Sequence, residues 1–387
     1  MGAVSPDVSN SGHPGRDVIT PGTRRRPSPN PIVTAAATTG SRRFERPSVG
    51  YLLGVRVVVT GASGNIGSAV LRELTSDGEH DVLGVARRKP FIPHESAFAS
   101  VHWQSVDVAR DDLDEVFAGA DAVVHLAWMF QPTRRPSVTW ATNVVGTRRV
   151  LEAVGRQHVG AVVCSSSVAA YSAVDHDDPV DEGWATDGAS PAAYAREKAY
   201  VERILDTFEA NHPDTRVVRM RPAFVFQRSA ASEQRRIFGG TLARPTLFDP
   251  RHIPVLPVPH GLRLQAVHAG DVARAFSAAV HRPVTGAFNL SGDGVLRREE
   301  LGALLETRTV DVPVGAVHAA LAAAWRARLA PVPAELFDAL LHVPVMSSDR
   351  ARGELEWQPR HSGADALAAL FSGAQMRAGS TMPPLQP

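Results

Sequence analysis

Tyr194 and Lys198 lie four residues apart in the segment Tyr194-Ala195-Arg196-Glu197-Lys198, which places both side chains on the same face of a helix. A free tyrosine has a pKa of about 10, too high for a base at neutral pH. A nearby ammonium group favours the phenolate and lowers that pKa towards the range in which general acid–base catalysis is efficient. The pair therefore predicts a catalytic tyrosine assisted by a lysine. Exposed helices also carry such pairs, so the neighbouring motifs must show whether this pair is catalytic or an ordinary surface feature.

Further polar residues precede this pair. Ser165, Ser166 and Ser167 end a predicted strand, at the edge where catalytic residues of α/β proteins gather. We expect Ser167 to hydrogen-bond the substrate oxygen and Ser166 to line the substrate pocket, with helix capping or a turn as the alternative role. Asn143, a fourth candidate catalytic residue, lies on the preceding predicted helix. Its amide either bends that helix, holds a water that links Lys198 to solvent, or makes a local structural hydrogen bond.

A glycine-rich segment, residues 60–67, follows an apolar run and precedes apolar residues with helical spacing. Strand, glycine turn and helix start together form a binding site for the diphosphate of a dinucleotide, whereas glycines alone could be an ordinary flexible loop. Gly61 permits the tight turn, Gly64 lets the diphosphate approach the backbone, and Gly67 lets the helix pack closely on the strand. The expected cofactor contacts are Gly61, Ser63, Gly64, Asn65, Ile66 and Gly67.

The second predicted strand indicates which nicotinamide cofactor binds. It ends in Gly84-Val85-Ala86-Arg87-Arg88-Lys89, without the acidic residue that binds the ribose 2′-hydroxyl in NAD enzymes. A guanidinium suits a 2′-phosphate, because its donors form planar, charge-assisted hydrogen bonds. Arg87 and Arg88 therefore favour NADP(H), with NAD(H) possible. The alternative is a solvated basic loop.

The elements that position these residues alternate between strand and helix from residue 55 to about residue 225. Predicted strands cover residues 55–60, 81–87, 101–108, 121–127, 161–167 and 216–221, and predicted helices cover 65–76, 111–118, 138–157 and 192–210. Apolar strands that alternate with amphipathic helices imply a parallel sheet covered on both faces. The fold class is therefore α/β, a doubly wound parallel Rossmann sheet.

The alternation breaks down after residue 226. A strand and a helix are expected at 265–268 and 271–281, another strand at 288–291, and mainly helix after residue 297. This part predicts a smaller, mainly helical C-terminal lid that binds substrate. The expected division is a disordered Pro/Ser/Arg-rich tail (1–52), an NAD(P)-binding Rossmann domain with the catalytic Tyr/Lys pair (53–226), a substrate-binding portion interleaved with it (227–372, of which 264–291 returns to the sheet) and a flexible tail (373–387).

Composition excludes several classes of protein. The 387 residues carry 41 Lys and Arg against 40 Asp and Glu, which disfavours nucleic-acid binding. Cys164 is the single cysteine, so a disulfide framework is excluded, and a reducing compartment and a buried core position are expected. The scattered histidines predict no metal site, and no apolar run reaches the roughly 18 residues that span a membrane. We expect a cytoplasmic enzyme.

The Arg-rich, acid-poor start of the chain leaves alternatives open. It suggests an organelle transit peptide, whereas export is disfavoured because no apolar segment follows the arginines. A translation start near residue 55 is a further possibility, and the intact mass of the native protein would test it.

Taken together, the motifs resemble those of the extended short-chain dehydrogenases/reductases, of the NAD-dependent epimerase/dehydratase kind. The matching pieces are residues 60–67, Asp107-Val108, His125-Leu126-Ala127, 143–147, 165–171, 194–198, Arg221-Pro222 and 268–272. The resemblance implies hydride transfer to or from nicotinamide C4, a Tyr/Lys/Ser/Asn active site, and homodimers packed through the helices that carry Asn143 and Tyr194.

By position, the resemblance also implies individual roles. Tyr194 is the acid/base, Lys198 orients the nicotinamide ribose and lowers the tyrosine pKa, and Ser167 polarises the substrate oxygen. Asp107 and Val108 flank the adenine. Leu126 and Ala127 complete the expected cofactor contacts.

The substrate pocket departs from that of the sugar-nucleotide epimerases of this family. They typically carry Asn soon after the Arg of the sixth strand, where this chain has Ala223, and an Arg four residues before His268, where Leu264 stands and Arg263 is one position off. The expected pocket residues are instead Trp128, Phe130, Ser166, Phe224 and Gln265. The aromatic members indicate a hydrophobic pocket, with ordinary core packing as the alternative.

These observations predict an NAD(P)-dependent oxidoreductase that interconverts a carbonyl and an alcohol on a small, apolar substrate. A nucleotide-sugar epimerase or dehydratase is the first alternative. The second is a non-catalytic dinucleotide-sensing protein on the same fold. Such sensors usually lose the Tyr or the Lys, and here both are retained.

Overall fold

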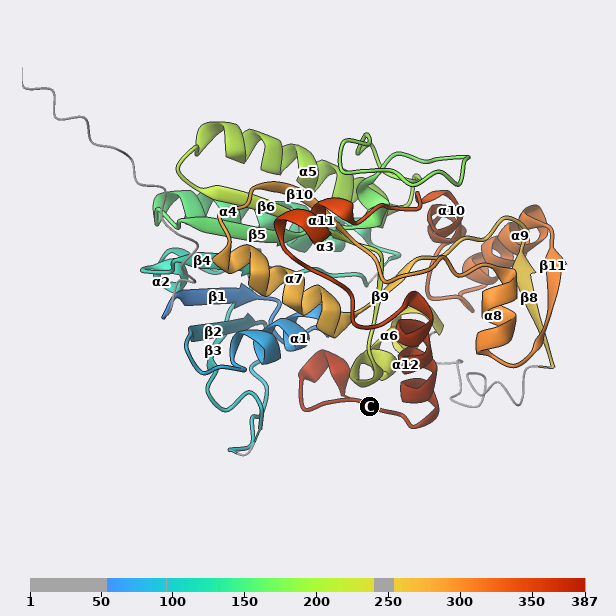
Figure 1. The fold of residues 1–387 in the computed structure, drawn as a ribbon, viewed down its shortest axis with the longest axis horizontal. Coiled ribbons are helices and arrows are strands. Elements are labelled where there is room, and N and C mark those ends of the chain that lie inside the picture. Colours follow the sequence, from blue (N-terminus) through green and yellow to red (C-terminus); the bar gives the residue numbers. More distant parts are fainter. Residues whose placement is uncertain (1–53, 95, 132, 240–253, 387) are drawn as a thin grey trace, which may run out of the picture. The chain divides into compact units, whose positions relative to one another are not determined.

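The computed structural model describes residues 54–94, 96–131, 133–239 and 254–386, so the predicted tail 1–52 lies outside the described residues (Figure 1). The described strands are β1 Arg56–Thr60, β2 Asp81–Ala86, β3 His102–Ser105, β4 Ala122–His125, β5 Ala161–Ser165, β6 Arg216–Pro222, β7 Phe224–Phe226, β8 Val255–Pro259, β9 Ala266–His268, β10 Gly286–Leu290 and β11 Arg308–Val312. The described helices are α1 Asn65–Leu74, α2 Asp114–Phe117, α3 Pro136–Trp140, α4 Gly146–Arg156, α5 Ala193–Asn211, α6 Ala231–Gln234, α7 Ala269–His281, α8 Arg298–Leu304, α9 Val314–Arg326, α10 Ala334–His342, α11 Asp349–Glu354 and α12 Gly363–Gln375.

Seven strands form one parallel sheet in the order β10-β6-β5-β4-β1-β2-β3. The chain runs outward from β1 to β3, returns to β4 on the other side of β1, and continues to β6. In such a sheet ligands bind outside the carboxyl ends of the strands, at the point where the order reverses, here between β1 and β4. The predicted doubly wound Rossmann sheet is confirmed.

Alternate residues of the central strands supply two separate apolar layers, because successive side chains point to opposite faces of a sheet. Val57 and Val59 belong to the layer under α1 and α7, whereas Val58 belongs to the layer under α2, α4 and α5. All three valines have no exposed surface. Helices α1 and α7 pack against each other on their face of the sheet (Figure 1). This double coverage explains why the strands read as continuous apolar runs.

The chain beyond β7 is mainly helical, as predicted, and β9 and β10 lie where strands were predicted, whereas β8 and β11 were not predicted. β9 pairs with β7, and β11 pairs with β8, in two small parallel pairs. β10 returns to the main sheet beside β6. Figure 1 shows α8, α9, β8 and β11 gathered at one side, away from the central sheet.

The segment after α12 differs from the flexible tail predicted for 373–387. Met382 and Leu385 have no exposed surface and belong to the main apolar cluster. Arg236 donates hydrogen bonds to the carbonyl oxygens of Pro384 and Gln386, both at 2.6 Å. The predicted flexible tail is therefore wrong for the described residues up to 386, because two apolar side chains anchor them.

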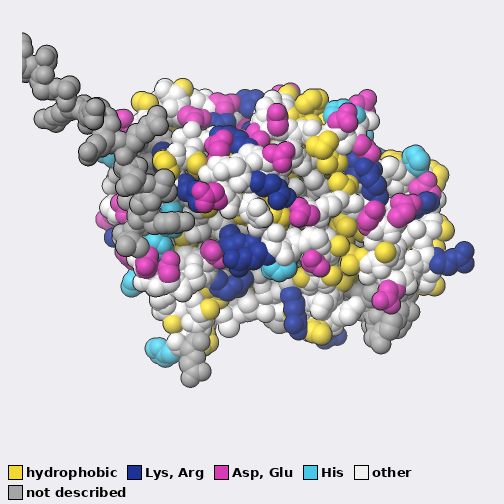
Figure 2. All heavy atoms as spheres, in the orientation of Figure 1, with side chains coloured by type: hydrophobic (Ala, Val, Ile, Leu, Met, Phe, Trp, Pro, Cys, Tyr) yellow, Lys and Arg dark blue, Asp and Glu magenta, His cyan; other side chains and the backbone are white. Residues whose placement is uncertain are grey.

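The surface drawn in Figure 2 carries Lys and Arg side chains interspersed with Asp and Glu side chains. This mixture agrees with the near-equal counts of 41 basic and 40 acidic residues. In the described part of the chain, no helix is long and apolar enough to cross a membrane.

Candidate active site

The glycine turn between β1 and α1 fits so closely against its neighbours that side chains are excluded. Gly61 has a φ of +69°, and a Cβ atom there would lie 2.6 Å from backbone atoms of Leu126 and Ala127. A Cβ atom on Gly67 would lie 2.3 Å from the Gly61 carbonyl oxygen. Gly67 therefore lets α1 pack on the turn itself, whereas we predicted packing on the strand. No side chain caps the first turn of α1 at Gly64, which leaves its N–H groups for a ligand.

A cavity of about 1000 Å³ opens at the carboxyl ends of the strands. Its wall includes most of the residues predicted for the site: Gly61, Ser63, Gly64, Asn65, Ile66, Gly67, Arg87, Arg88, Val108, Leu126, Ala127, Trp128, Phe130, Ser166, Ser167, Tyr194, Lys198 and Phe224. Three predicted residues, Asp107, Asn143 and Gln265, do not line it.

The three exceptions bond to the protein instead. The Asp107 carboxylate accepts from the backbone N–H of Ala109 at 3.0 Å and so holds the turn after β3. The Gln265 amide accepts from the backbone N–H of Met346 at 2.7 Å and donates to its carbonyl oxygen at 3.1 Å. Gln265 therefore ties β9 to the segment before α11, and its prediction as a pocket residue was wrong.

The Tyr194 hydroxyl donates to Ser167 Oγ at 3.2 Å, so the two hydroxyl groups share one region of the cavity. Ser167 also accepts from the backbone N–H of Ala169 at 3.1 Å, the capping role that we gave as its alternative. Burial raises the pKa of Tyr194, and the hydrogen bond with Ser167 opposes this shift. A substrate oxygen between the two hydroxyls would have two hydrogen-bond partners.

Lys198 does not lower the pKa of Tyr194 in the way that we expect from the sequence. Its ammonium donates to the Ser165 carbonyl oxygen at 2.8 Å and lies 3.5 Å from the centre of the Trp128 ring. Burial lowers the pKa of Lys198 to about 7, so the charge needed to stabilise a phenolate is itself weakened. The amine instead interacts with a backbone oxygen and an aromatic ring. The spacing of Tyr194 and Lys198 in the sequence cannot reveal these two interactions.

Aromatic side chains surround the tyrosine. The Phe130 ring centre lies 5.2 Å from that of Tyr194 and 5.2 Å from that of Phe238, and Trp128 meets Tyr194 edge to face at 5.9 Å. Further apolar residues of the wall are Phe224, Phe226, Ile237, Leu321, Val332, Leu336, Phe337, Leu340 and Val343. Several come from α9 and α10, so the C-terminal portion closes the cavity with apolar surface.

Asn143 lies in a π-helical turn, Ala141–Val145, which interrupts the predicted helix 138–157 between α3 and α4. Its side chain accepts from the backbone N–H of Met129 at 2.6 Å and donates to the Met129 carbonyl oxygen at 2.8 Å. It also donates to Glu197 Oε2 at 2.6 Å. Asn143 therefore makes structural hydrogen bonds, although to residues distant in sequence. It fixes the chain after β4 against α5.

Two buried residues that the sequence reasoning missed support the site. Glu197 lies between Tyr194 and Lys198 on α5, accepts from Thr139 Oγ1 at 2.6 Å, and has a pKa that burial raises. His125, at the end of β4, hydrogen-bonds the hydroxyls of Thr60 at 2.7 Å and Thr147 at 2.9 Å. Both residues stand inside quoted motifs, but only the fold reveals their partners.

Ser166 lines the cavity, but its hydroxyl is engaged. It donates to Glu202 Oε1 at 2.6 Å, and Arg221 binds both oxygens of the same carboxylate, at 2.9 and 3.0 Å. Arg221 also donates to the hydroxyl of Tyr171 at 2.9 Å. Glu202 has no exposed surface, so this ion pair lies beneath the cavity floor. The Arg221 of the quoted motif thus orders the serine-rich end of β5.

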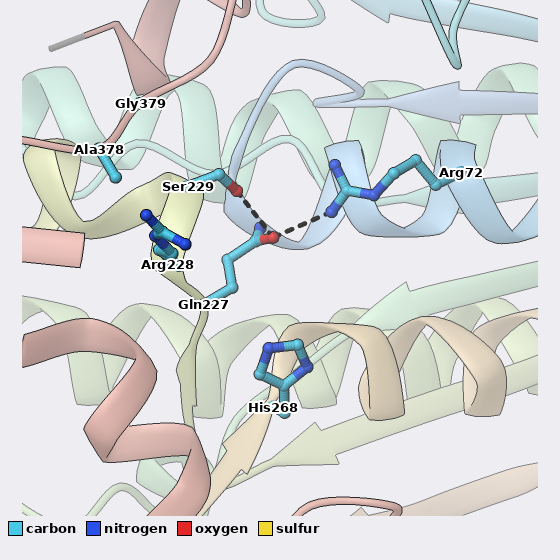
Figure 3. Close-up of a pocket in the computed structure, with 7 residues that line it drawn as sticks. All are labelled: Arg72, Gln227, Arg228, Ser229, His268, Ala378 and Gly379. Carbon is cyan, nitrogen blue, oxygen red and sulfur yellow. Dashed lines mark hydrogen bonds between the residues drawn. The ribbon is translucent and has the colours of Figure 1, made fainter. Parts of the chain in front are cut away.

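A second, polar crevice of about 400 Å³ lies between Arg72 of α1, the chain after β7 and the C-terminal segment (Figure 3). Gln227 stands at its centre, where its Oε1 accepts from Arg72 and from Ser229, both at 2.9 Å. The Nε2 of Gln227 donates to the carbonyl oxygen of Asn65 at 2.7 Å. Gln227 is a further residue that we did not predict, and it fixes the start of α1 to the chain that follows β7.

In the described residues, no group of three or more His, Cys, Asp or Glu side chains could hold a metal ion. Cys164 is buried in β5, and burial raises its pKa to about 12. The thiol therefore lacks the thiolate character of a nucleophile.

Comparisons with known proteins place these features in a family. Residues 57–291 match the NAD dependent epimerase/dehydratase family. An uncharacterized protein of Mycobacterium tuberculosis is 27% identical over 266 residues, which are 67% of this chain and 24% of that protein. This chain thus spans about a quarter of that relative's length. A 4-hydroxy-2-methyl-3-oxo-4-farnesyl-3,4-dihydroquinoline-1-oxide ketoreductase of Stigmatella aurantiaca is 26% identical over 337 residues, 82% of this chain and 96% of that protein.

Among solved structures, the UDP-glucose 4-epimerase of Thermotoga maritima with UDP-glucose has a TM-score of 0.63. The match covers 84% of this chain and 99% of that one, at 19% identity. At this level of identity the likeness shows the fold alone.

Proposed function

The chain belongs to the NAD-dependent epimerase/dehydratase family of enzymes, and from this premise we propose that it is an NADP(H)-dependent ketoreductase. It would interconvert a carbonyl and an alcohol on a small, apolar molecule. The observation that carries the proposal is that Trp128 and Phe130 contact the ring of Tyr194, whose hydroxyl bonds to Ser167, and that Phe238 extends this aromatic wall through Phe130. An acid/base pair in an apolar cavity suits a substrate whose main polar group is its carbonyl.

The cavity wall fits a dinucleotide. The glycine turn leaves backbone room for a diphosphate, and the exposed Arg87 and Arg88 line the same cavity at the end of β2. Among the described residues, neither guanidinium has a hydrogen bond or ion pair, which leaves both for a 2′-phosphate. NAD(H), the cofactor in the family's name, is the alternative. When bound, the dinucleotide supplies or accepts the hydride.

Residues of this chain would transfer the proton to or from the substrate oxygen. Tyr194 would donate its proton to the substrate oxygen while Ser167 hydrogen-bonds the same oxygen. Lys198 reaches the cavity wall at Ser165 and, with a pKa of about 7, carries its charge in part of the molecules at neutral pH. We propose that the amine leaves the Ser165 carbonyl for the nicotinamide ribose when the cofactor binds.

A nucleotide-sugar epimerase is the second candidate, and the fold shared with the Thermotoga maritima UDP-glucose 4-epimerase favours it. Two features oppose it. Ala223 and Leu264 replace polar residues of the sugar-nucleotide site, and Arg263 is held elsewhere, by the Asp177 carboxylate at 2.6 Å and the Val174 carbonyl oxygen at 2.9 Å. The ketoreductase similar to this chain over 82% of its length has an apolar farnesyl group in its name.

The proposal is tested with the purified chain, NADPH, and a panel of aryl and alkyl ketones beside UDP- and dTDP-sugars. We expect NADPH oxidation with apolar ketones. Tyr194→Phe should lower kcat by at least about a hundredfold, while the Kd for NADPH changes by less than about twofold. Tyr200→Phe, at an exposed tyrosine six residues along the same helix, is the matched control. Wild-type turnover in Tyr194→Phe, or epimerisation of a UDP-sugar with tightly retained NAD, would contradict the proposal. Tight cofactor binding without turnover on any substrate would favour a sensor.

We also propose a homodimer through the helices that carry Asn143 and Tyr194. Tyr200 lies on the same helix as Tyr194, and Trp140 directly precedes the turn of Asn143; they have 49% and 38% of their surface exposed, and their ring centres lie 5.0 Å apart. Light scattering of Tyr200→Glu against wild type tests the interface, and an unchanged dimer would contradict it.

A further inference from the structure

Glu233 is a carboxylic acid in the cavity wall, where Gln234 and Arg236 are its polar neighbours and Ile237 and Phe238 its apolar ones. It belongs to the short helix α6, which is followed by the wall residues Ile237 and Phe238. The neighbouring wall comes from the C-terminal segment, through Pro383 and Pro384. Burial raises the pKa of Glu233 to about 7, although the residue keeps part of its surface exposed.

The protein gives this carboxyl group no hydrogen-bond partner within the described residues. Arg236 acts on it only through its charge, since its guanidinium donates to the carbonyl oxygens of Pro384 and Gln386. Gln234, the next residue, donates to the Val225 carbonyl oxygen at 2.8 Å. Glu233 is half-buried and lines the cavity, so its carboxyl oxygens can accept a hydrogen bond from a bound ligand.

Two buried carboxylates near the site show the contrast with the half-buried Glu233. Glu197 accepts hydrogen bonds from Thr139 and Asn143, and Glu202 accepts from Ser166 and from Arg221. Both are used to hold elements together. Glu233 holds nothing by hydrogen bonds in the described structure, so its presence in the cavity needs another reason.

We propose that Glu233 forms a polar subsite that binds a hydrogen-bond donor of the substrate, a hydroxyl or N–H group distinct from the carbonyl that reacts at Tyr194. The substrate class is then an apolar carbonyl compound that carries one such donor. This inference rests on the proposed function, whose substrate it narrows. The same carboxyl group disfavours a phosphate or carboxylate at this place, because two anions in an apolar wall repel each other.

Replacing Glu233 should change the stability of the ligand-free protein in the direction opposite to that expected for a residue that stabilises the fold. Glu233→Leu replaces an unpartnered carboxyl group by an apolar side chain of similar size. We expect it to raise the melting temperature of the ligand-free protein by about 2–4 °C. A glutamate that stabilised the fold would give a lower melting temperature when replaced.

Ligand binding is measured by calorimetry on the Tyr194→Phe protein loaded with NADPH, so that no turnover occurs. The probes are two series of aryl ketones with alkyl spacers of increasing length, one ending in a hydroxyl group and the other in a methyl group. In the Glu233 background, we expect the best hydroxyl-ended ketone to bind about 10- to 100-fold more tightly than its methyl-ended partner. Glu233→Leu should remove this preference, Glu233→Gln should keep part of it, and Glu115→Gln, on the exposed surface of α2, should leave it intact.

The outcomes separate this inference from the proposed function. Equal binding of both series, or a preference that persists in Glu233→Leu, overturns the subsite, and failure of both series to bind does the same. If wild type still reduces methyl-ended ketones, the proposed function survives that result. A Glu233-dependent preference without hydride transfer in the wild-type protein supports the subsite and refutes the ketoreductase.

Discussion

The buried imidazole of His125 makes the stability of this protein depend on pH in a window that follows from its surroundings. Both ring nitrogens hydrogen-bond threonine hydroxyls, those of Thr60 and Thr147. Burial lowers the pKa of His125 to about 3, and the charge of Lys198 contributes to this shift. In the unfolded chain a histidine takes up its proton near pH 6.5, at about its ordinary pKa. The free energy of unfolding is therefore highest above about pH 6.5 and falls as the pH decreases towards about 3.

The size of the effect follows from the two pKa values. Lowering the pKa from 6.5 to about 3 corresponds to about 5 kcal/mol over the whole window. About 2 kcal/mol of it is lost between about pH 7.5 and about pH 5, before most carboxylates titrate. His125→Gln is neutral throughout this range. The free energy of unfolding of wild type minus that of His125→Gln should therefore fall by about 2 kcal/mol between these two pH values.

Urea unfolding followed by tryptophan fluorescence and by circular dichroism at several pH values provides the measurement. The readout is the change of the difference with pH, because the amide introduced by His125→Gln retains an unknown number of the threonine hydrogen bonds at any one pH. His94→Gln, at an exposed histidine, is the control, and its curve should run parallel to that of wild type. A difference between wild type and His125→Gln that stays constant within about 0.5 kcal/mol would refute the reasoning.

Two further predictions concern the cofactor and the cysteine. Replacing Arg87 and Arg88 together by Ala should raise the Kd for NADPH at least about tenfold and change that for NADH much less, as measured by fluorescence titration, because a 2′-phosphate loses its cationic partners. An equal effect on both cofactors would contradict NADP(H) preference. Cys164, whose pKa burial raises to about 12, should resist a thiol-specific disulfide reagent at pH 8 in the folded protein and react once urea unfolds it. Rapid reaction of the folded protein would show that β5 is accessible.

The central sheet was predictable because its signals are local. Each strand of the Rossmann sheet is buried on both faces and therefore reads as a short apolar run, and β1, β2, β4, β5 and β6 all begin within a residue or so of their predicted positions. The glycine turn was predictable for the same reason, since the positive φ of Gly61 and the contacts at Gly67 leave room for no other residue. These requirements act within a few residues of chain.

Other features depend on residues that only the fold brings together. The 373–386 segment has a composition typical of a flexible tail, but Met382 and Leu385 find an apolar cluster to which distant segments contribute. Gln265 was predicted to line the substrate pocket. Its side-chain amide instead forms two hydrogen bonds with the backbone of Met346, 81 residues further along the chain. Asn143, in the π-helical turn, likewise donates to Glu197, which lies on another helix.

The polar groups around the active site fall into two kinds, and the distinction bears on the substrate. The carboxylates of Glu197 and Glu202 accept hydrogen bonds from other residues of the protein, so they connect α5 to its neighbours and offer nothing to a ligand. The hydroxyls of Tyr194 and Ser167 remain in the cavity for a reacting oxygen. Among the described wall residues of the lid, the carboxyl group of Glu233 has no hydrogen-bonded partner in the protein. A substrate that satisfies both places must carry a carbonyl and a donor joined by an apolar body, which is why the choice between a hydroxyl-ended and a methyl-ended ketone tests the site as a whole.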